Sequence, residues 1–225
     1  MKRCLIVFAR EPRKGRVKTR LSSVLTQQQS LDLYKAFVRD TLDIARKAHA
    51  DQRIVAFDSD GSVPTFLKRI APDFLIMKQK GRTLGCRLHN ASLSQVGTGN
   101  KHVVIIGSDA PNLPAKIIEE AFVRLKRSDV VFGPALDGGY YLVGMKNPCK
   151  RLFQGIAWSS SEVLLQSIAK ARKMRMRVGV LAAWYDVDDK ESLKLLIDDV
   201  RKTGLKTGQY TRRVLQCMNL KPTIR

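Results

Sequence analysis

The chain has 225 residues, of which 44% are apolar and 27% are charged. This length suits one α/β domain, and the chain holds too much Val, Ile, Leu and Phe to be intrinsically disordered. The apolar run at residues 4–9 is much too short for a signal-peptide core or a membrane span, so we expect neither. Four widely spaced cysteines without a CxxC pair argue against a disulfide framework or a zinc site, and they favour reduced thiols in the cytoplasm.

Forty-one Lys and Arg residues against twenty Asp and Glu give a formal net charge of +21. The basic residues concentrate at 1–20, 170–177 and 201–225. A basic protein attracts polyanions, so nucleic acid is the first partner to consider. However, no nucleic-acid recognition motif accompanies the charge, and only 7% of the residues are aromatic. We therefore expect the last two runs to form a solvated surface that binds nucleic acid weakly and without sequence preference, and the first run to bind an anionic small molecule such as a nucleotide.

Short apolar runs alternate with segments of helical spacing along the chain. The expected strands cover residues 5–8, 53–57, 74–77, 102–106, 130–133, 140–144 and 177–183. The expected helices cover residues 22–48, 63–70, 84–96, 114–127, 159–174 and 189–202. This alternation predicts an α/β fold in which a mostly parallel sheet has helices on both faces. Without a repeat or linker, we expect a single domain over residues 1–225, of which 201–225 form a basic C-terminal helix or tail.

In such a sheet, ligands bind beyond the carboxyl ends of the strands, and this rule selects the loops of interest. The loop at residues 9–20 follows the first strand and holds one glycine and six basic side chains. It is neither a Walker loop nor a GxGxxG loop. Backbone N–H groups and a helix N-terminus favour phosphate, and Lys or Arg would neutralise its charge. We therefore favour phosphate binding here over an exposed basic loop.

Carboxylates follow two other expected strands. Ser108 and Asp109 come after the most apolar strand, where a carboxylate can hold Mg²⁺ or Mn²⁺ through oxygen, although either residue could instead cap the next helix. The acidic segment 186–188 follows the last strand, and its carboxylates near Asp109 would give the cluster that magnesium–nucleotide chemistry uses. Asp188 could equally cap the helix that follows. The acids at 58–60 are interpreted as a turn.

Two glycine-containing segments complete the candidate loops. Gly138 and Gly139 follow Asp137 between two expected strands, where paired glycines allow close approach of the backbone to a ligand or merely form a tight hairpin. Asp137 could orient a hydroxyl or act as a base, or it could serve only the turn. The segment 81–85 precedes a helix and could wrap a base or a ribose.

The segments FAREPRKGRVKTRL, GSDAPNLP, GPALDGGYYLVG, WSSSEVL and DVDD occur in this order. Together they resemble a bacterial family of GT-A-type nucleotide-diphospho-sugar transferases, often labelled arsenosugar-biosynthesis-type glycosyltransferases. That family is similar to the guanylyltransferases that make 2-phospho-lactate and molybdenum-cofactor dinucleotides. The resemblance covers roughly residues 3–200, and the joint pattern is much more specific than any one segment. It implies a GT-A fold, a nucleotide held by the first loop, and Mg²⁺ or Mn²⁺ held by Asp109 with help from Asp188.

Within this pattern, Lys18 and Arg20 match the family's KTRL, and Gly138 and Gly139 match its DGG. The expected nucleotide-binding residues are Ala9, Arg10, Gly15, Lys18, Arg20, Gly81, Leu84, Gly85, Ser108, Gly138 and Gly139. Two segments depart from the family. Where the family has GDLGER, residues 81–87 of this chain are GRTLGCR, so the segment expected to contact the base or ribose lacks the family's acidic residue. Where the family has DVDT, residues 186–189 of this chain are DVDD.

Three functional hypotheses follow. The first is a glycosyltransferase that uses a nucleoside diphosphate-sugar and a divalent metal, with Asp137 as the catalytic residue that orients or deprotonates a small-molecule acceptor. The second is a nucleotidylyltransferase that releases pyrophosphate; basic residues between Lys14 and Arg20 favour it, and the absence of a GxG loop opposes it. The third is a non-enzymatic nucleic-acid-binding protein, favoured if the basic runs share one face and the carboxylates do not converge. The nucleotide, the acceptor and the oligomeric state stay open.

Overall fold

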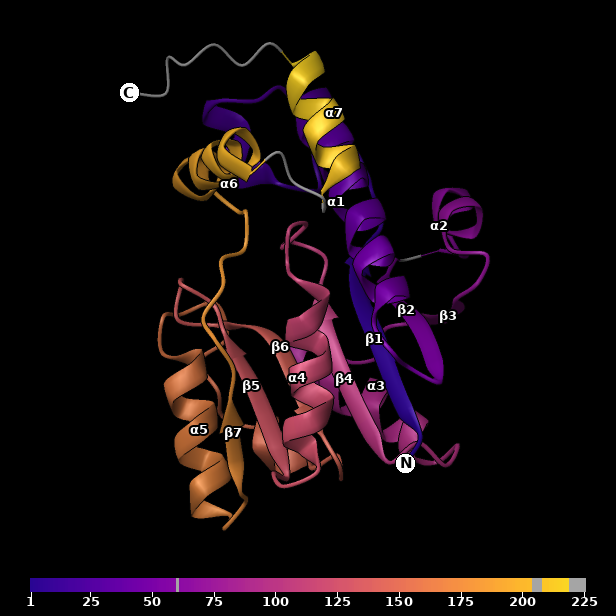
Figure 1. Ribbon diagram of the computed structural model, residues 1–225, viewed down its shortest axis with the longest axis vertical. Coiled ribbons are helices and arrows are strands. Elements are labelled where there is room, and N and C mark those ends of the chain that lie inside the picture. Colours follow the sequence, from indigo (N-terminus) through magenta and orange to yellow (C-terminus); the bar gives the residue numbers. More distant parts are fainter. Residues whose placement is uncertain (60, 204–207, 219–225) are drawn as a thin grey trace.

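The computed structural model describes residues 1–59, 61–203 and 208–218. Its centre is a seven-stranded sheet in the order β3-β2-β1-β4-β6-β5-β7 (Figure 1). The strands are β1 (Arg3–Arg10), β2 (Gln52–Asp58), β3 (Leu75–Lys78), β4 (His102–Gly107), β5 (Val130–Pro134), β6 (Tyr140–Met145) and β7 (Val178–Val180).

Strand direction follows from the connections. β1 pairs in parallel with β2 and β4, β2 with β3, and β5 with β7. Parallel neighbours require a long crossover, and helices fill these crossovers. β6 runs antiparallel to β4 and β5, because only the short turn at residues 135–139 separates it from β5. The prediction of a mostly parallel sheet is therefore confirmed.

Helices cover both faces of the sheet. They are α1 (Gln27–Lys47), α2 (Thr65–Ile70), α3 (Leu84–Val96), α4 (Ala115–Leu125), α5 (Val163–Lys173), α6 (Lys190–Thr203) and α7 (Gln209–Cys217), with short 3₁₀ helices η1 (Thr19–Ser23) and η2 (Lys150–Phe153). Alternate side chains of a strand point to opposite faces. Leu5 and Val7 pack with α1 and α4, whereas Cys4 and Ile6 pack with α3 and α5. This confirms the expected sheet with helices on both faces, which is a three-layer α/β/α sandwich.

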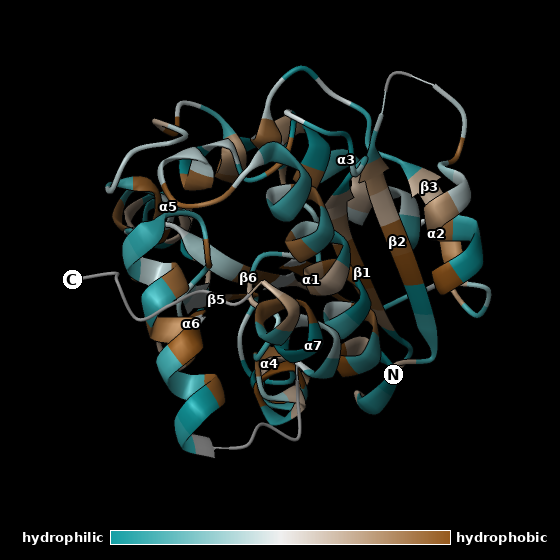
Figure 2. Cartoon of the chain, turned by 90° about the horizontal axis from the view of Figure 1, so that it is seen from above, coloured by the Kyte–Doolittle hydropathy of each residue, from teal (hydrophilic) through white to brown (hydrophobic). Residues whose placement is uncertain are grey.

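A third apolar cluster joins the C-terminal helices to α1. It includes Leu21 of η1, Phe37 of α1, Leu196 of α6 and Leu215 of α7. In Figure 2, α6 alternates between hydrophobic and hydrophilic residues, as expected of a helix that packs on one side. The segment expected as a basic helix or tail thus contains a packed helix, α7, while residues 204–207 and 219–225 lie outside the described part. Among the helices of that part, none is long and apolar enough to span a membrane.

Some element bounds differ from the sequence-based expectation. α1 begins at Gln27 and not at residue 22, because Thr26 caps it: the Thr26 hydroxyl accepts from the Gln29 N–H at 3.2 Å, and the Gln29 side chain accepts from the Thr26 N–H at 2.8 Å. α5 begins at Val163 and not at residue 159, because residues 159–162 form a turn. η2 was not predicted.

Candidate active site

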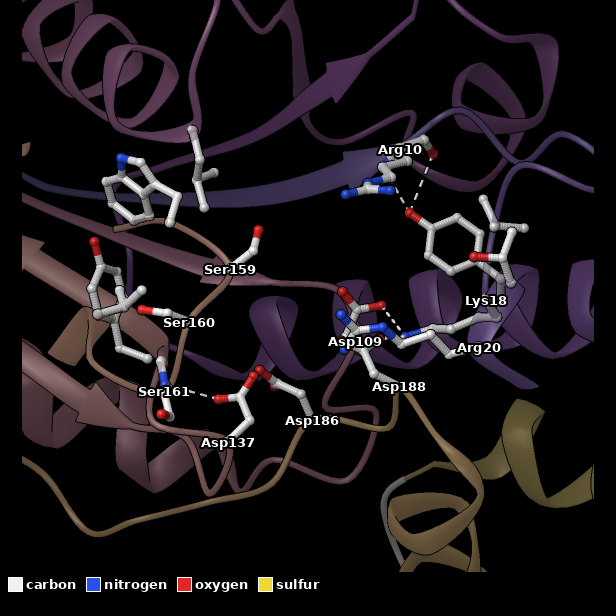
Figure 3. A pocket seen from close by; sticks show the side chains of 18 residues that line it. Arg10, Lys18, Arg20, Asp109, Asp137, Ser159, Ser160, Ser161, Asp186 and Asp188 are labelled. Carbon is white, nitrogen blue, oxygen red and sulfur yellow. Dashed lines mark hydrogen bonds and ion pairs between the residues drawn. The ribbon is translucent and has the colours of Figure 1, made fainter. Parts of the chain in front are cut away.

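A cleft lies beyond the carboxyl ends of β1 and β4 and consists of two adjoining chambers of about 520 and 560 Å³. The first, here the carboxylate chamber, is lined by four Asp residues, by Arg10, Lys18 and Arg20, and by a serine segment, residues 159–161 (Figure 3). The second, the strand-end chamber, is lined by the ends of β1, β2 and β4 and by residues before and within α3. Seven residues line both chambers: Arg10, Leu84, Asp109, Tyr140, Trp158, Ser159 and Asp186.

Tyr34 of α1 ties the strand ends together at the base of the cleft. Its hydroxyl accepts from the Arg10 backbone N–H at 2.6 Å and lies 3.2 Å from the Ser108 hydroxyl oxygen. Burial and the nearby charge of Asp109 raise the pKa of Tyr34 to about 12, so the hydroxyl keeps its proton. One buried side chain thereby fixes the loops that follow β1 and β4.

Lys18 brings two carboxylates together. Its Nζ donates to Asp188 Oδ1 at 2.8 Å and forms an ion pair with Asp109 Oδ1. The Lys18 side chain is only 3% exposed, whereas those of Asp109 and Asp188 are 37% and 47% exposed. Burial by itself would lower the pKa of Lys18, but the charges of the two carboxylates raise it to about 12. The expected convergence of Asp109 and Asp188 is therefore present, with an ammonium between them.

The backbone couples the same two loops. The Val187 N–H donates to the Asp109 carbonyl at 2.8 Å, and the Val187 carbonyl accepts from Lys18 Nζ at 2.8 Å. Because Val187 is fully buried, this contact holds the acidic segment 186–188 against the loop after β4. The relative position of the two carboxylates is thus built into the fold.

Two further carboxyl groups, those of Asp137 and Asp186, complete the chamber. Burial first, and then the charges of Asp109 and Asp188, raise the pKa of Asp186 to about 8. Asp137 Oδ1 accepts from the Gly139 N–H at 2.9 Å. Asp137 thus makes the turn contact expected from its sequence and also faces the cavity, as Figure 3 shows.

The sequence-predicted nucleotide-binding residues divide into two groups. Arg10, Lys18, Arg20, Leu84 and Gly139 line the carboxylate chamber, and Ala9 and Ser108 line the strand-end chamber. The described residues that line the two chambers do not include the remaining four, which are Gly15, Gly81, Gly85 and Gly138.

Two of these glycines, Gly85 and Gly138, allow close packing of the backbone around the cleft. A Cβ on Gly85 would lie 2.7 Å from the Phe153 carbonyl oxygen and 2.7 Å from the Trp158 ring. Gly138 has φ +88°, and a Cβ there would lie 2.0 Å from the Ser161 carbonyl oxygen. The DGG turn therefore packs directly on the serine segment.

Sequence reasoning missed part of the cleft wall. Trp158 and the serine segment line the carboxylate chamber, and Ser159 adopts φ +71° there, which is rare for a non-glycine residue. The available signal was the WSSSEVL segment, which we assigned to a helix. Asp58, interpreted as a turn residue, ends β2, forms an ion pair with Arg87 and lines the strand-end chamber.

The donor set can be tested against a divalent cation. The described residues contain no group of three or more His, Cys, Asp or Glu side chains that could hold a metal ion. Mg²⁺ is, however, usually bound by one or two carboxylates together with waters and substrate phosphates. Asp109 and Asp188 supply two partly exposed carboxylates of this kind. They fit a Mg²⁺ or Mn²⁺ ion whose other ligands would be waters or phosphate oxygens.

Comparison with known proteins gives a family and a close structural match. The family model described as "Uncharacterized protein conserved in bacteria (DUF2064)" matches residues 41–160. A search of curated proteins gives no match. A Desulfovibrio desulfuricans G20 protein of solved structure, described as a "putative nucleotide-diphospho-sugar transferase", is 31% identical with a TM-score of 0.88. The match covers 96% of this chain and 95% of that chain.

More distant structures share the fold alone. A cytidylyltransferase from Leptospira borgpetersenii is 9% identical with a TM-score of 0.56, over 97% of this chain and 94% of that one. Rv0371c from Mycobacterium tuberculosis H37Rv, solved in complex with manganese, is 17% identical with a TM-score of 0.53, over 89% and 100%. None of these descriptions mentions arsenosugars, so that part of the resemblance stays a prediction.

Proposed function

The chain belongs to the bacterial DUF2064 family, and we propose that it is a transferase acting on a nucleotide or nucleotide-sugar in the cleft beyond β1 and β4. One observation carries the proposal: Arg10 and Arg20 share a chamber with the carboxylates of Asp109 and Asp188 (Figure 3). Guanidinium groups bind phosphate oxygens, and paired carboxylates suit a divalent ion on those phosphates. The 31% identical D. desulfuricans protein supports the same class of activity.

Within this class, we favour glycosyl transfer from a nucleoside diphosphate-sugar. Only three of the six basic residues between positions 10 and 20 line the carboxylate chamber, namely Arg10, Lys18 and Arg20. This part of the loop's positive charge suits a diphosphate better than a triphosphate. Mg²⁺ or Mn²⁺ held by Asp109 and Asp188 would, when bound, stabilise charge on the leaving diphosphate.

The residues of the chamber suggest how an acceptor reacts. An acceptor hydroxyl attacks the anomeric carbon, a new C–O bond forms, and the bond from that carbon to the diphosphate oxygen breaks, so that the nucleoside diphosphate leaves. The hydroxyl proton passes to the carboxylate of Asp137. Because Asp137 Oδ1 accepts a hydrogen bond from the Gly139 N–H, Oδ2 is the oxygen that takes this proton. Arg10 and Arg20 hold the departing charge.

A nucleotidylyltransferase is the second candidate, because the chain shares its fold with a cytidylyltransferase. In that reaction a phosphorylated acceptor attacks the α-phosphorus of a nucleoside triphosphate, the bond to the β-phosphate breaks, and pyrophosphate leaves. The released product therefore separates the two candidates. One of the conditions set for a nucleic-acid-binding protein is not met, since Asp109 and Asp188 converge. Of the described residues in the basic runs, those in α5 and α7 lie at opposite ends of the molecule (Figure 1).

The test is a thermal-shift screen of nucleoside triphosphates and of UDP-, GDP-, CDP- and TDP-sugars, with and without Mn²⁺. A ligand that binds the folded state raises its apparent stability. We expect a diphosphate-sugar to give the largest manganese-dependent shift. Asp109→Asn should remove the manganese dependence without loss of fold, whereas Asp198→Asn on α6, outside the chambers, should not. A larger shift with a triphosphate favours the second candidate, and no shift with any nucleotide contradicts both.

A further inference from the structure

Lys18 uses its whole hydrogen-bonding capacity inside the protein. An ammonium group has three N–H donors. Lys18 Nζ donates to Asp188 Oδ1 and to the Val187 carbonyl, and its third close partner is Asp109 Oδ1, with which it forms an ion pair. The group also lies 5.2 Å from the centroid of the Phe37 ring, and the side chain is 3% exposed. In this arrangement Lys18 has no donor left for a phosphate, although its sequence position predicts a phosphate contact.

The same ammonium occupies the position of a cation between two carboxylates. Lys18 Nζ pairs with Oδ1 of both Asp109 and Asp188, so a divalent ion that binds through these oxygens takes the place of the ammonium, and one that binds through the Oδ2 oxygens lies close beside it. It would also sit beside a positive charge in a partly buried site, where repulsion is screened less than in water. The divalent ion and Lys18 therefore compete for the same pair of carboxylates.

The backbone at Lys18 agrees with a residue held by its contacts. Lys18 has φ 51° and ψ 40°, in the left-handed region, immediately before η1. Non-glycine residues adopt this conformation at an energetic cost and keep it only where the surroundings enforce it. The side-chain contacts of Lys18 come from residues about 170 positions further along the chain.

We propose that Lys18 is the resident cation of the Asp109–Asp188 pair, and that Mg²⁺ or Mn²⁺ binds these carboxylates only by displacing its ammonium into the carboxylate chamber. The inference rests on the proposed function for the identity of the divalent ion. The displaced ammonium then regains donors for a phosphate. Cation and nucleotide consequently bind with positive coupling, each favouring the other by the same factor.

The test uses Mn²⁺ alone, titrated against the full chain without nucleotide and followed by electron paramagnetic resonance of free Mn²⁺. Lys18→Met removes the competing charge and keeps an unbranched side chain beside Phe37. We expect this variant to bind Mn²⁺ about tenfold more tightly than the wild type, or more, because one like charge beside the ion is gone. Lys14→Met is the matched control: it makes the same change of charge on an exposed residue of the same loop and should bind Mn²⁺ like the wild type. Equal or weaker binding by Lys18→Met, or no binding by either protein, overturns the proposal.

A second measurement uses the wild type and does not depend on the variant folding. Acetylation by acetic anhydride, read by peptide mass spectrometry, should label Lys14 readily and Lys18 poorly, because the Lys18 side chain is buried and its Nζ contacts Asp109, Asp188 and the Val187 carbonyl. Saturating Mn²⁺ should increase labelling of Lys18 several-fold and leave Lys14 unchanged. Unchanged labelling of Lys18 overturns the proposal. Neither measurement includes a nucleotide, so its outcome is independent of the ligand screen that tests the proposed function.

Discussion

At Gly138, substitution by alanine should strongly disturb the packing of the cleft wall. Its φ of +88° is unfavourable for any residue with a Cβ, and this strain alone costs about 1–3 kcal/mol. The added Cβ would also lie 2.0 Å from the Ser161 carbonyl oxygen and 2.6 Å from the Ser161 Cα, both backbone atoms that cannot rotate away. The turn must therefore separate from the serine segment. This movement would lengthen or break the 2.9 Å hydrogen bond from the Leu164 N–H to the Gly138 carbonyl. We expect Gly138→Ala to lower the free energy of unfolding by about 3 kcal/mol or more.

Gly139→Ala is the matched control for this substitution. Its nearest atom is Asp137 Oδ1 at 3.1 Å, part of a side chain that can move, and its φ lies outside the left-handed region. We expect a change within about 1 kcal/mol, since alanine also restricts the unfolded chain. Urea unfolding followed by circular dichroism gives both values. A Gly138→Ala loss equal to that of Gly139→Ala would refute the close packing of the turn on the serine segment.

Three further predictions concern the cleft base, the sheet edge and the surface charge. Tyr34→Phe should cost about 1–3 kcal/mol in urea unfolding, because the Arg10 N–H loses its acceptor, and a smaller change would show that water replaces the hydroxyl. Hydrogen bonds from Arg177, together with its charge, lower the pKa of Asp129 to about 2, so Asp129 stabilises the fold above its unfolded pKa of about 4 and this contribution is lost as the pH falls toward 2. The Tm of Asp129→Asn should therefore lie below that of the wild type at pH 6 and converge with it near pH 2; a constant difference would contradict this. Random duplex DNA should bind weakly at low salt and lose affinity steeply as salt rises, whereas sequence-selective binding at physiological salt would favour a nucleic-acid-binding protein.

The fold was predictable because its main signals are local. Apolar runs give β1, β2 and β4, and the spacing of residues 84–96 gives α3 with its observed bounds, since Thr83 caps the helix by accepting from the Cys86 N–H at 3.2 Å. The serine segment was mispredicted as helix. Ser159 has φ +71°, and Ser161 packs against Gly138 of the DGG turn; this contact joins segments more than 20 residues apart, so the local sequence pattern does not predict it.

The sequence predicted which loops at the strand ends form the site, but it did not predict the contacts between their side chains. The rule that ligands bind there places Arg10, Asp109 and Asp188 in one cleft, and the structure does bring them together. The same rule predicts that Lys18 contacts phosphate, which stays a prediction; in the structure, Lys18 Nζ contacts the carboxylates of Asp109 and Asp188. The partners of the Lys18 ammonium are residues that only the tertiary fold brings close. A local sequence pattern therefore cannot predict them.

The most direct test of the account is a calorimetric titration, with Mn²⁺ present, of the nucleoside diphosphate that gives the largest thermal shift and of its parent nucleoside. Arg20 lines the carboxylate chamber, whereas Arg16, an exposed residue of the same loop, does not appear among the described lining residues. Arg20→Ala should weaken diphosphate binding by about 1–3 kcal/mol, as for a charge-assisted hydrogen bond, and leave nucleoside binding unchanged. Arg16→Ala should bind both ligands like the wild type. Equal losses in the two variants, or a loss in Arg20→Ala that is as large for the nucleoside as for the diphosphate, would contradict a phosphate site in this cleft.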